Sequence, residues 1–400
     1  MSSAPTTPTA PPLARFPEEW AAELVRLGGR AYHGRSVFKW VQGRGVTDPS
    51  AMTDLPASLR ARLADEGLGG VLSIVTERRA ADDTRKLLVA MADGANVETV
   101  LIPRVAGGRG ELPSPVPLEG GADDADAAAA VDDEDDPDPP AEAGAPVPVT
   151  QCISTQVGCA MGCVFCASGV AGLKRQMRPD EIVAQVLVGR SRLDPGEQLR
   201  NVVLMGMGEP LHNYEATARA LRLLTHREGI GLSTRKVTVS TSGLVPEIAR
   251  LGRDFAGQIG LAISLHAADD ETRSRLMPIN KKYPLAELMR ALREYPLPRR
   301  RRITIEYTLV AGRNDGREEA VKLARLLRGL PVKVNLIPMN PIEASTLGPP
   351  DLTSVLAFQR VLCDAGYSCF IRGRRGDEVS AACGQLVLLG ARAKVRVNRG

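Results

Sequence analysis

The octapeptide CAMGCVFC, residues 159–166, is the most informative part of this sequence, and it follows directly on the β-rich run CISTQV at residues 152–157. Three thiolates with this C-x3-C-x2-C spacing lie on one tight loop and can hold three irons of a [4Fe–4S] cubane. Gly158 and Gly162 would let the backbone pass close to the inorganic sulfides. The fourth iron then keeps the open position that a metal site needs to bind a substrate.

Cysteine usage supports cofactor chemistry over a disulfide framework. The chain has seven cysteines, and four of them (Cys152, Cys159, Cys163 and Cys166) fall within fifteen residues. The N-terminus lacks a basic start followed by an apolar stretch, so we expect a cytoplasmic protein, in which disulfides are rare. Two other interpretations of residues 159–166 remain. A structural zinc site usually has four ligands in two separated pairs, and buried free thiols can serve as small apolar residues.

From residue 151 onward, β-rich and helical runs alternate in the order that implies parallel strands. The predicted strands are 152–157, 201–206, 236–241, 260–265, 303–310 and 332–338. The predicted helices include 179–192, 213–227, 284–295 and 317–329. Six such units predict an α/β fold, a partial (β/α)6 barrel over residues 151–390, with catalytic groups at the C-terminal ends of the strands. Residues 391–400 would form a tail.

Four short motifs end predicted strands and follow the cysteine loop in order. They are Met-Gly-Met-Gly-Glu-Pro at 205–210, Ser-Thr-Ser-Gly at 240–243, Ser-Leu-His at 264–266 and Met-Asn-Pro at 339–341. Each alone is as compatible with a structural turn as with a ligand contact. Backbone oxygens at a strand end and the Glu209 carboxylate can accept hydrogen bonds from an ammonium group.

The cysteine spacing and these motifs resemble the radical-SAM superfamily. The resemblance implies a [4Fe–4S] cluster held by Cys159, Cys163 and Cys166, whose open iron chelates S-adenosylmethionine (SAM) for reductive cleavage to a 5′-deoxyadenosyl radical. It also implies SAM contacts from the strand-end motifs. The candidate residues for those contacts are Gly208, Glu209, Ser240, Ser264, Leu265, His266 and Asn340.

Two further cysteines narrow the resemblance. Cys383 stands in the small-residue segment Val-Ser-Ala-Ala-Cys-Gly-Gln, and Cys152 precedes the cluster loop. Together with the motifs above they resemble the dual-specificity RNA adenine-C2 methyltransferases, which act on 23S rRNA and tRNA. That family's pattern implies that Cys383 carries the methyl group, that Cys152 resolves the adduct through a transient disulfide, and that Glu98 accepts the proton. A glutamate alternating with valines, as Glu98 does, is otherwise usually a solvent-facing strand residue.

The N-terminal part predicts smaller units. Residues 1–12 read as a disordered tail, and residues 13–70 as a helical accessory domain with helices in 16–29, 34–45 and 58–67. Residues 71–103 read as a β-meander with strands at 71–78, 85–91 and 96–103. Residues 104–150 have the composition of an acidic disordered insertion, at a place where family members usually have a short connector. An acidic competitor for RNA is a second interpretation of it.

Charge favours a polyanionic partner. The net charge is +4, but residues 111–150 hold twelve Asp and Glu and no Lys or Arg, so the rest of the chain carries 51 basic against 35 acidic residues. The run Arg299–Arg302, with Lys281, Lys282, Arg372, Arg374 and Arg375 near the predicted barrel opening, suggests phosphate contact. Solvated surface remains an alternative, because aromatic residues make up only 4% of the chain.

The resemblance implies 23S rRNA and tRNA as substrates and an electron donor such as flavodoxin or ferredoxin. No run of eighteen apolar residues occurs, so no membrane partner is expected; we expect a monomer. Two alternatives stay open: a C8-specific relative acting on 23S rRNA, and a non-catalytic iron–sulfur RNA-binding protein, which would not need both Cys152 and Cys383. Ala-Ser-Gly after Cys166, where Thr-Gly is commoner in the family, removes no catalytic group.

Overall fold

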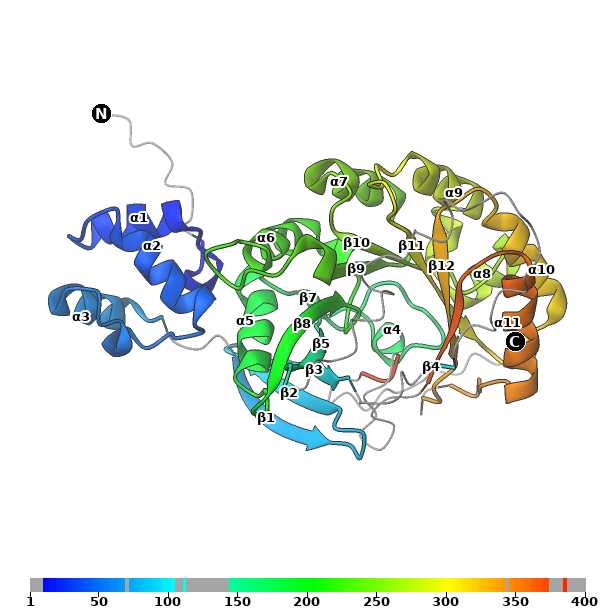
Figure 1. Cartoon of the computed structure of the whole chain (residues 1–400), viewed down its shortest axis with the longest axis horizontal. Helices are drawn as coiled ribbons and strands as arrows, with labels where there is room; N and C mark the ends of the chain where they lie inside the picture. The colour runs from blue at the N-terminus through cyan, green and yellow to red at the C-terminus, as the bar shows by residue number, and fades with distance from the viewer. Residues whose placement is uncertain are drawn as a thin grey trace.

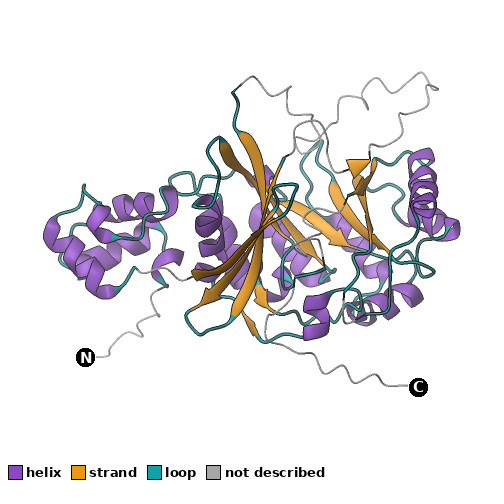
Figure 2. Ribbon diagram, turned by 90° about the horizontal axis from the view of Figure 1, so that it is seen from below, coloured by secondary structure: helices purple, strands orange, loops and turns teal. Residues whose placement is uncertain are grey.

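The computed structural model describes residues 10–68, 72–104, 111–112, 144–342, 345–373 and 384–386. It consists of a helical lobe, a curved sheet and a layer of helices on the outer face of that sheet (Figures 1 and 2). Cys383, Arg374 and Arg375 lie outside the described residues, as do residues 391–400.

The N-terminal lobe contains three helices, as predicted. They are α1 (Pro17–Arg26), α2 (His33–Phe38), which continues as a π-helical turn over Lys39–Gly43, and α3 (Ala57–Glu66). Short 3-10 turns lie at Pro12–Ala14 and Pro49–Ala51. Trp20 and Phe38 are fully buried in its core. Two arginines join the lobe to the rest of the molecule: Arg190 donates to the Gly43 carbonyl at 2.9 Å and Arg219 to the Ala14 carbonyl at 2.8 Å.

The predicted meander is present as three antiparallel strands, β1 (Leu72–Arg79), β2 (Arg85–Met91) and β3 (Asn96–Pro103). It is not a separate sheet, because β3 pairs antiparallel with β5 of the main sheet, with Val100 opposite Cys152.

The main sheet has a core of parallel strands. They are β5 (Val147–Cys152), β8 (Glu197–Leu204), β9 (Val237–Thr241), β10 (Gly260–Ser264), β11 (Ile303–Leu309), β12 (Val332–Pro338) and β13 (Cys369–Arg372). They pair in this order in the described part of the chain. The partial barrel is thus confirmed, with β13 as a seventh strand beyond the six predicted units.

Helices cover the outer face of the parallel strands (Figure 1). The longer ones are α5 (Pro179–Arg190), α6 (Tyr214–Leu224), α7 (Val245–Phe255), α9 (Leu285–Glu294), α10 (Arg317–Leu326) and α11 (Leu352–Asp364). Two short ones, α4 (Ala167–Ala171) and α8 (Asp270–Leu276), lie in loops after strands. Among the described residues, every helix is too short or too polar to cross a lipid bilayer.

The strand predicted at residues 152–157 is wrong in its bounds. The barrel strand β5 ends at Cys152, and the chain then crosses the end of β8, where the Gly206 amide donates to the Ile153 carbonyl at 3.0 Å. Gln156–Val157 instead form β6, which pairs antiparallel with β7 (Arg175–Gln176) in a separate two-stranded sheet. Residue types cannot set these bounds, because a strand ends where its partner strands end.

The predicted insertion, residues 104–150, begins directly after β3, but two parts of it are strands. Residues 147–150 belong to β5, so the expected boundary between residues 150 and 151 falls inside a strand. Glu111–Leu112 form β4, which pairs antiparallel with β13. The structure does not describe residues 105–110 and 113–143.

Candidate active site

The three motif cysteines line one cavity of about 520 Å³ inside the partial barrel. They come from the segment between β6 and β7, residues 158–174, which includes α4 and which we call the cysteine loop. This loop follows the C-terminal end of β5, the end of a parallel sheet at which such folds carry their chemistry. Cys159 is buried, and Cys163 and Cys166 are half-buried.

A short hairpin holds the base of the cysteine loop. β6 and β7 pair, and the Cys159 amide donates to the Gly172 carbonyl at 3.3 Å. Gly158 has φ +79°, and a Cβ there would lie 1.9 Å from the Gly172 oxygen. Gly158 is therefore required by the close approach of the two chain segments, which differs from the contact with sulfides that the sequence suggested.

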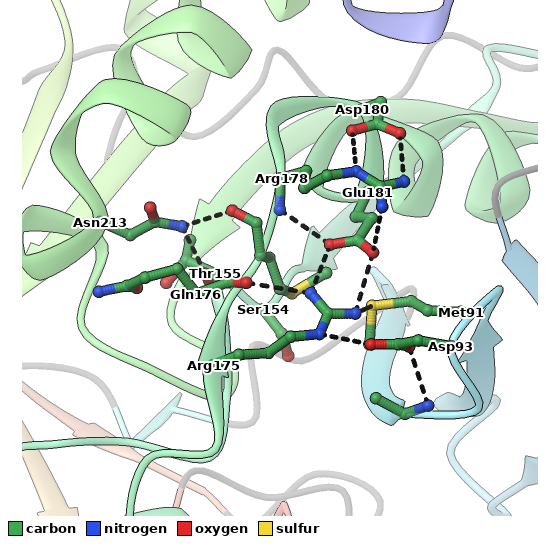
Figure 3. Close-up of polar contacts among 12 residues, drawn as sticks. Met91, Asp93, Ser154, Thr155, Arg175, Gln176, Arg178, Asp180, Glu181 and Asn213 are labelled. Carbon is green, nitrogen blue, oxygen red and sulfur yellow. Dashed lines mark hydrogen bonds and ion pairs between the residues drawn. The ribbon is translucent and has the colours of Figure 1, made fainter. Parts of the chain in front are cut away.

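Arg175 ties this hairpin to two other elements (Figure 3). Its guanidinium donates to both carboxylate oxygens of Glu181, at 2.8 and 3.0 Å, and to Asp93 at 2.7 Å. Glu181 lies in the first turn of α5 and is buried, whereas Asp93 lies in the turn between β2 and β3. Asn213 holds the hairpin from the other side, since its amide donates to the carbonyls of Thr155 and Met177.

The cysteine side chains fit a cluster better than a single metal ion. Burial raises the pKa of Cys159 to about 12, and burial also raises the pKa values of Cys163 and Cys166. Thiols in such a place ionise when a metal centre displaces their protons. Among the described residues, no three His, Cys, Asp or Glu side chains converge on a point suitable for one metal ion. A [4Fe–4S] cubane needs one thiolate for each of three irons, which the three cysteines would supply, whereas a structural zinc site usually has four ligands.

Gly208 and Glu209 both line the cavity after the end of β8. Glu209 is buried, and its carboxylate accepts from the Ser242 amide at 2.7 Å, the Ser242 hydroxyl at 2.8 Å and the Leu211 amide at 3.1 Å. Burial raises the pKa of Glu209 above its usual value. These bonds join the loops after β8 and β9, so the Glu209 carboxylate already has a structural role that the sequence did not reveal.

The other strand-end residues lie around the same cavity, with one exception. Ser240, Ser264, His266 and Asn340 line it, and the Ser240 and Ser264 hydroxyl oxygens are 3.5 Å apart. Leu265 is fully buried in the hydrophobic core and is not among the lining residues. Only its backbone therefore stands near the site, and its amide donates to the Glu306 carbonyl.

His266 is held as a neutral ring. Its Nδ1 accepts from the Thr308 amide at 2.9 Å, and Phe165 of the cysteine loop packs edge-on with ring centroids 4.8 Å apart. Burial, with the nearby charge of Arg273, lowers the pKa of His266 to about 3. With Nδ1 as an acceptor, the proton of the neutral ring belongs on Nε2, which makes that nitrogen a hydrogen-bond donor.

The three predicted catalytic residues, Cys152, Glu98 and Cys383, stand in different relations to the cavity. Cys152 lines the cavity and is half-buried. Glu98 is 4% exposed and pairs with Lys86 at 2.9 Å, so it is not a solvent-facing residue. It shares a strand face with Ile102, which lines the cavity, but Glu98 itself is not a lining residue. The position of Cys383 is not described, but the next residue, Gly384, lines the cavity and accepts from the Ala167 amide at 2.9 Å.

The basic residues do not form one group. Arg299–Arg302 precede β11, at the end of the barrel opposite the cysteine loop, and none of the four lines the cavity. Arg301 and Arg302 donate to Gln258 and Ser368, which precede β10 and β13. Arg372 does line the cavity, 3.8 Å from Glu306. The arginine run precedes a strand, as the sequence indicates, and it lies away from the cavity that Arg372 lines.

Arg273 is not among the site residues that the sequence predicted. It is fully buried and donates to the Leu265 carbonyl at 3.0 Å, the Ser242 carbonyl at 2.7 Å and Asn280 at 2.9 Å. Burial lowers its pKa to about 10. Arg273 thus holds together the loops after β9 and β10, both of which carry predicted SAM contacts. Nothing in its local sequence marks it, because arginine is common on helix surfaces.

A polar inner wall was also missed, although the sequence carries a signal for it. Thr304, Glu306 and Thr308 of β11 and Lys333 and Asn335 of β12 all line the cavity. They alternate with apolar residues, whereas strands buried on both faces usually read as continuous apolar runs. Asn335 donates to Glu306 at 3.0 Å.

Comparison with known proteins agrees with this geometry. Residues 153–326 match the radical SAM superfamily, and residues 18–67 match a ribosomal RNA large subunit methyltransferase N-terminal domain. The dual-specificity RNA methyltransferase RlmN of Sorangium cellulosum is 69% identical, covering 96% of this chain and 97% of its own. That of Syntrophobacter fumaroxidans is 40% identical, covering 92% and 95%.

Comparison with a solved structure agrees with these sequence matches. The crystal structure of a radical SAM methyltransferase from Sphaerobacter thermophilus superposes with a TM-score of 0.80 at 40% identity, over 95% of this chain and 99% of that one. Relatives of this similarity and coverage share both the helical lobe and the barrel. The chain therefore belongs to the RlmN family of dual-specificity RNA methyltransferases, within the radical SAM superfamily.

Proposed function

We propose that this protein methylates C2 of adenosine in 23S rRNA and in tRNA, with Cys383 as the methyl carrier. One observation supports the proposal most directly. A single cavity is lined by the three motif cysteines, by Cys152 and by Gly384, the neighbour of Cys383. The proposal also implies that the protein acts in the cytoplasm and that it is a monomer. Gel filtration tests the oligomeric state.

The residues of this chain have separate tasks in the proposed reaction. Adenine C2 is an electron-poor carbon and a poor nucleophile toward a sulfonium methyl group, so direct transfer is disfavoured. Cys383 would instead take the methyl group from one SAM as a thiolate nucleophile. Cys159, Cys163 and Cys166 would hold a [4Fe–4S] cluster, which would supply the one-electron chemistry on a second SAM by which a hydrogen atom is removed from the S-methyl group of Cys383.

Release of the product would need a proton acceptor and a second thiol. Cys152 would attack the Cys383 sulfur, freeing the methylated RNA and leaving a disulfide to be reduced. Glu98 would accept the C2 proton. The ion pair with Lys86 holds the Glu98 carboxylate in place, and the Ser154 hydroxyl donates to the Glu98 backbone carbonyl at 2.7 Å.

Residues at or just after the ends of β8, β9, β10 and β12 would orient SAM. Gly208 and Glu209 provide a strand end next to the cysteine loop, and the Glu209 carboxylate fixes the loop after β9. The Ser240 and Ser264 hydroxyls and the neutral His266 add polar groups around the same space. Asn340 completes this set from the end of β12.

Product analysis tests the proposal. Protein reconstituted anaerobically with iron and sulfide would be incubated with SAM, a reductant and unmodified rRNA or tRNA, and nucleosides identified by mass spectrometry. We expect 2-methyladenosine, abolished by Cys383→Ala and retained in Cys363→Ala, a half-buried cysteine on α11 that does not line the cavity. A product methylated at C8 would assign the C8 activity, and SAM cleavage without methylated RNA would refute the substrate assignment.

A further inference from the structure

The outer side of the cysteine loop carries a second hollow, separate from the active-site cavity. An open depression of about 390 Å³ lies there, lined by Ala160, Met161, Pro278, Ile279, Lys281 and Lys282. Met161 also lines the active-site cavity, so this depression and the cavity lie on opposite sides of the same short loop. Lys281 and Lys282 are exposed.

The wall between the two spaces is thin. Cys159 and Cys163 line the cavity, while Ala160 and Val164 are exposed on the other side, with 37% of Val164 accessible. The loop packs directly on the segment that forms the rest of the depression, since the Val164 amide donates to the Leu276 carbonyl at 3.1 Å. Residues that line the depression therefore neighbour, along the same loop, the cysteines that would hold a cluster.

The chemistry of this surface suits a protein that delivers electrons. Its floor is apolar, and its charged lining residues are the two lysines, a combination that attracts an acidic surface by long-range steering. Electron-transfer encounters bury little area, so a small depression is sufficient. No aromatic side chain is among its lining residues, so it offers no platform for stacking bases, and RNA contact through the two lysines is an outcome that the test below separates from carrier docking.

We propose that this depression is the docking surface of a small acidic one-electron carrier, a flavin or iron–sulfur protein, that reduces the cluster. One electron leaves the carrier and enters the cluster; no bond forms or breaks, and no proton transfer by this chain is required. The inference rests on the proposed function for the presence of the cluster. It adds the partner surface and the two lysines that select the carrier.

The test measures reduction of the cluster directly, without RNA. Reconstituted full-length protein would be mixed in a stopped-flow instrument with a reduced flavodoxin, whose surface is acidic, and separately with dithionite. In Lys281→Glu/Lys282→Glu we expect reduction by flavodoxin to slow about tenfold at low ionic strength. Reduction by dithionite should be unchanged. The wild-type rate should fall with added salt, and the rate of the variant should not.

The control is Arg325→Glu/Arg328→Glu, which changes the net charge by the same amount. These exposed arginines lie at the end of α10 that leads into β12, away from the cysteine loop. The inference is overturned if the lysine variant accepts electrons from flavodoxin at the wild-type rate, or slows no more than the control. It is equally overturned if dithionite reduction slows as well, or if RNA affinity falls by the same factor. Methylation driven by dithionite tests the proposed function separately.

Discussion

Gly208 shows how a single residue conditions this site. Its φ is +106°, and a Cβ there would lie 2.6 Å from Gln156, whose side chain accepts from the Glu209 amide at 2.8 Å. Any other residue would meet both a backbone penalty and a steric clash. Gly208 is therefore needed for the strand end after β8 to approach the base of the cysteine loop.

We expect Gly208→Ala to lower the free energy of unfolding by about 3 kcal/mol, the backbone and overpacking costs together. It should also weaken SAM binding, measured by equilibrium dialysis. Gly196→Ala is the matched control, because Gly196 has φ +85° but a Cβ added there would meet no atom within 4 Å. That variant should lose only about 1 kcal/mol. Equal losses in urea unfolding would contradict a steric role for Gly208.

The roles assigned to Cys152 and Cys383 predict opposite results when each cysteine is replaced by alanine. If Cys152 releases the RNA, then Cys152→Ala should carry the reaction to the covalent stage and stop. RNA should then migrate with the protein on a denaturing gel, whereas Cys383→Ala and the double variant should show no such band. A Cys152→Ala enzyme that turns over repeatedly would refute the resolving role.

At the scale of elements, the cysteine loop depends on the β6–β7 hairpin for its position. Arg175 links that hairpin to α5 and to the turn between β2 and β3, three segments distant in sequence. Loops of this kind hold a fixed geometry only when rigid elements support them. The hairpin, with Arg175, supplies that support.

Replacing Arg175 with Met should destabilise the protein by about 3 kcal/mol, because Glu181 is 1% exposed and would lose its bidentate partner. The loss should show in urea unfolding and in a lower iron content after reconstitution. Arg275→Met is the matched control, because Arg275 forms an exposed ion pair with Glu271 on α8. Its loss should lower the free energy of unfolding by about 0.5 kcal/mol. Similar effects of the two substitutions would refute an anchoring role for Arg175.

At the scale of the whole molecule, charge is distributed unevenly along the chain. Residues 113–143 hold eleven acidic residues and no basic ones, whereas the rest is strongly basic. An RNA that approaches the protein experiences the combined electrostatic field of the acidic segment and of the basic remainder. The acidic segment should therefore weaken RNA binding by repulsion alone.

Deleting residues 113–143 should therefore raise RNA affinity several-fold at low salt and steepen its salt dependence, as measured by filter binding. The difference should shrink at high salt, where exposed charges are screened. A version with its acidic residues changed to Asn and Gln keeps the length and should behave like the deletion. If that version matches the wild type instead, the length of the segment matters and its charge does not.

Much of the fold followed from local pattern. The meander strands, the three N-terminal helices and most barrel helices appear within a few residues of their expected positions, because period and turn residues are local properties. The bounds of β5 did not follow. Pro148 interrupts the β-branched residues of 147–150, and these residues form a strand because β3 and β8 lie on either side.

The three motif cysteines and the strand-end motifs could be predicted as a site from the sequence alone, because metal ligation and loop chemistry need particular residue types at fixed spacing along the chain. The tertiary structure alone decided the burial of Glu98 beside Lys86, the clamp formed by Arg273, the polar inner wall and the opposite placement of Arg299–Arg302. Each of these depends on segments far apart in the chain that meet only after folding. Contacts between such segments are set by packing, and packing leaves no pattern in the neighbouring residues.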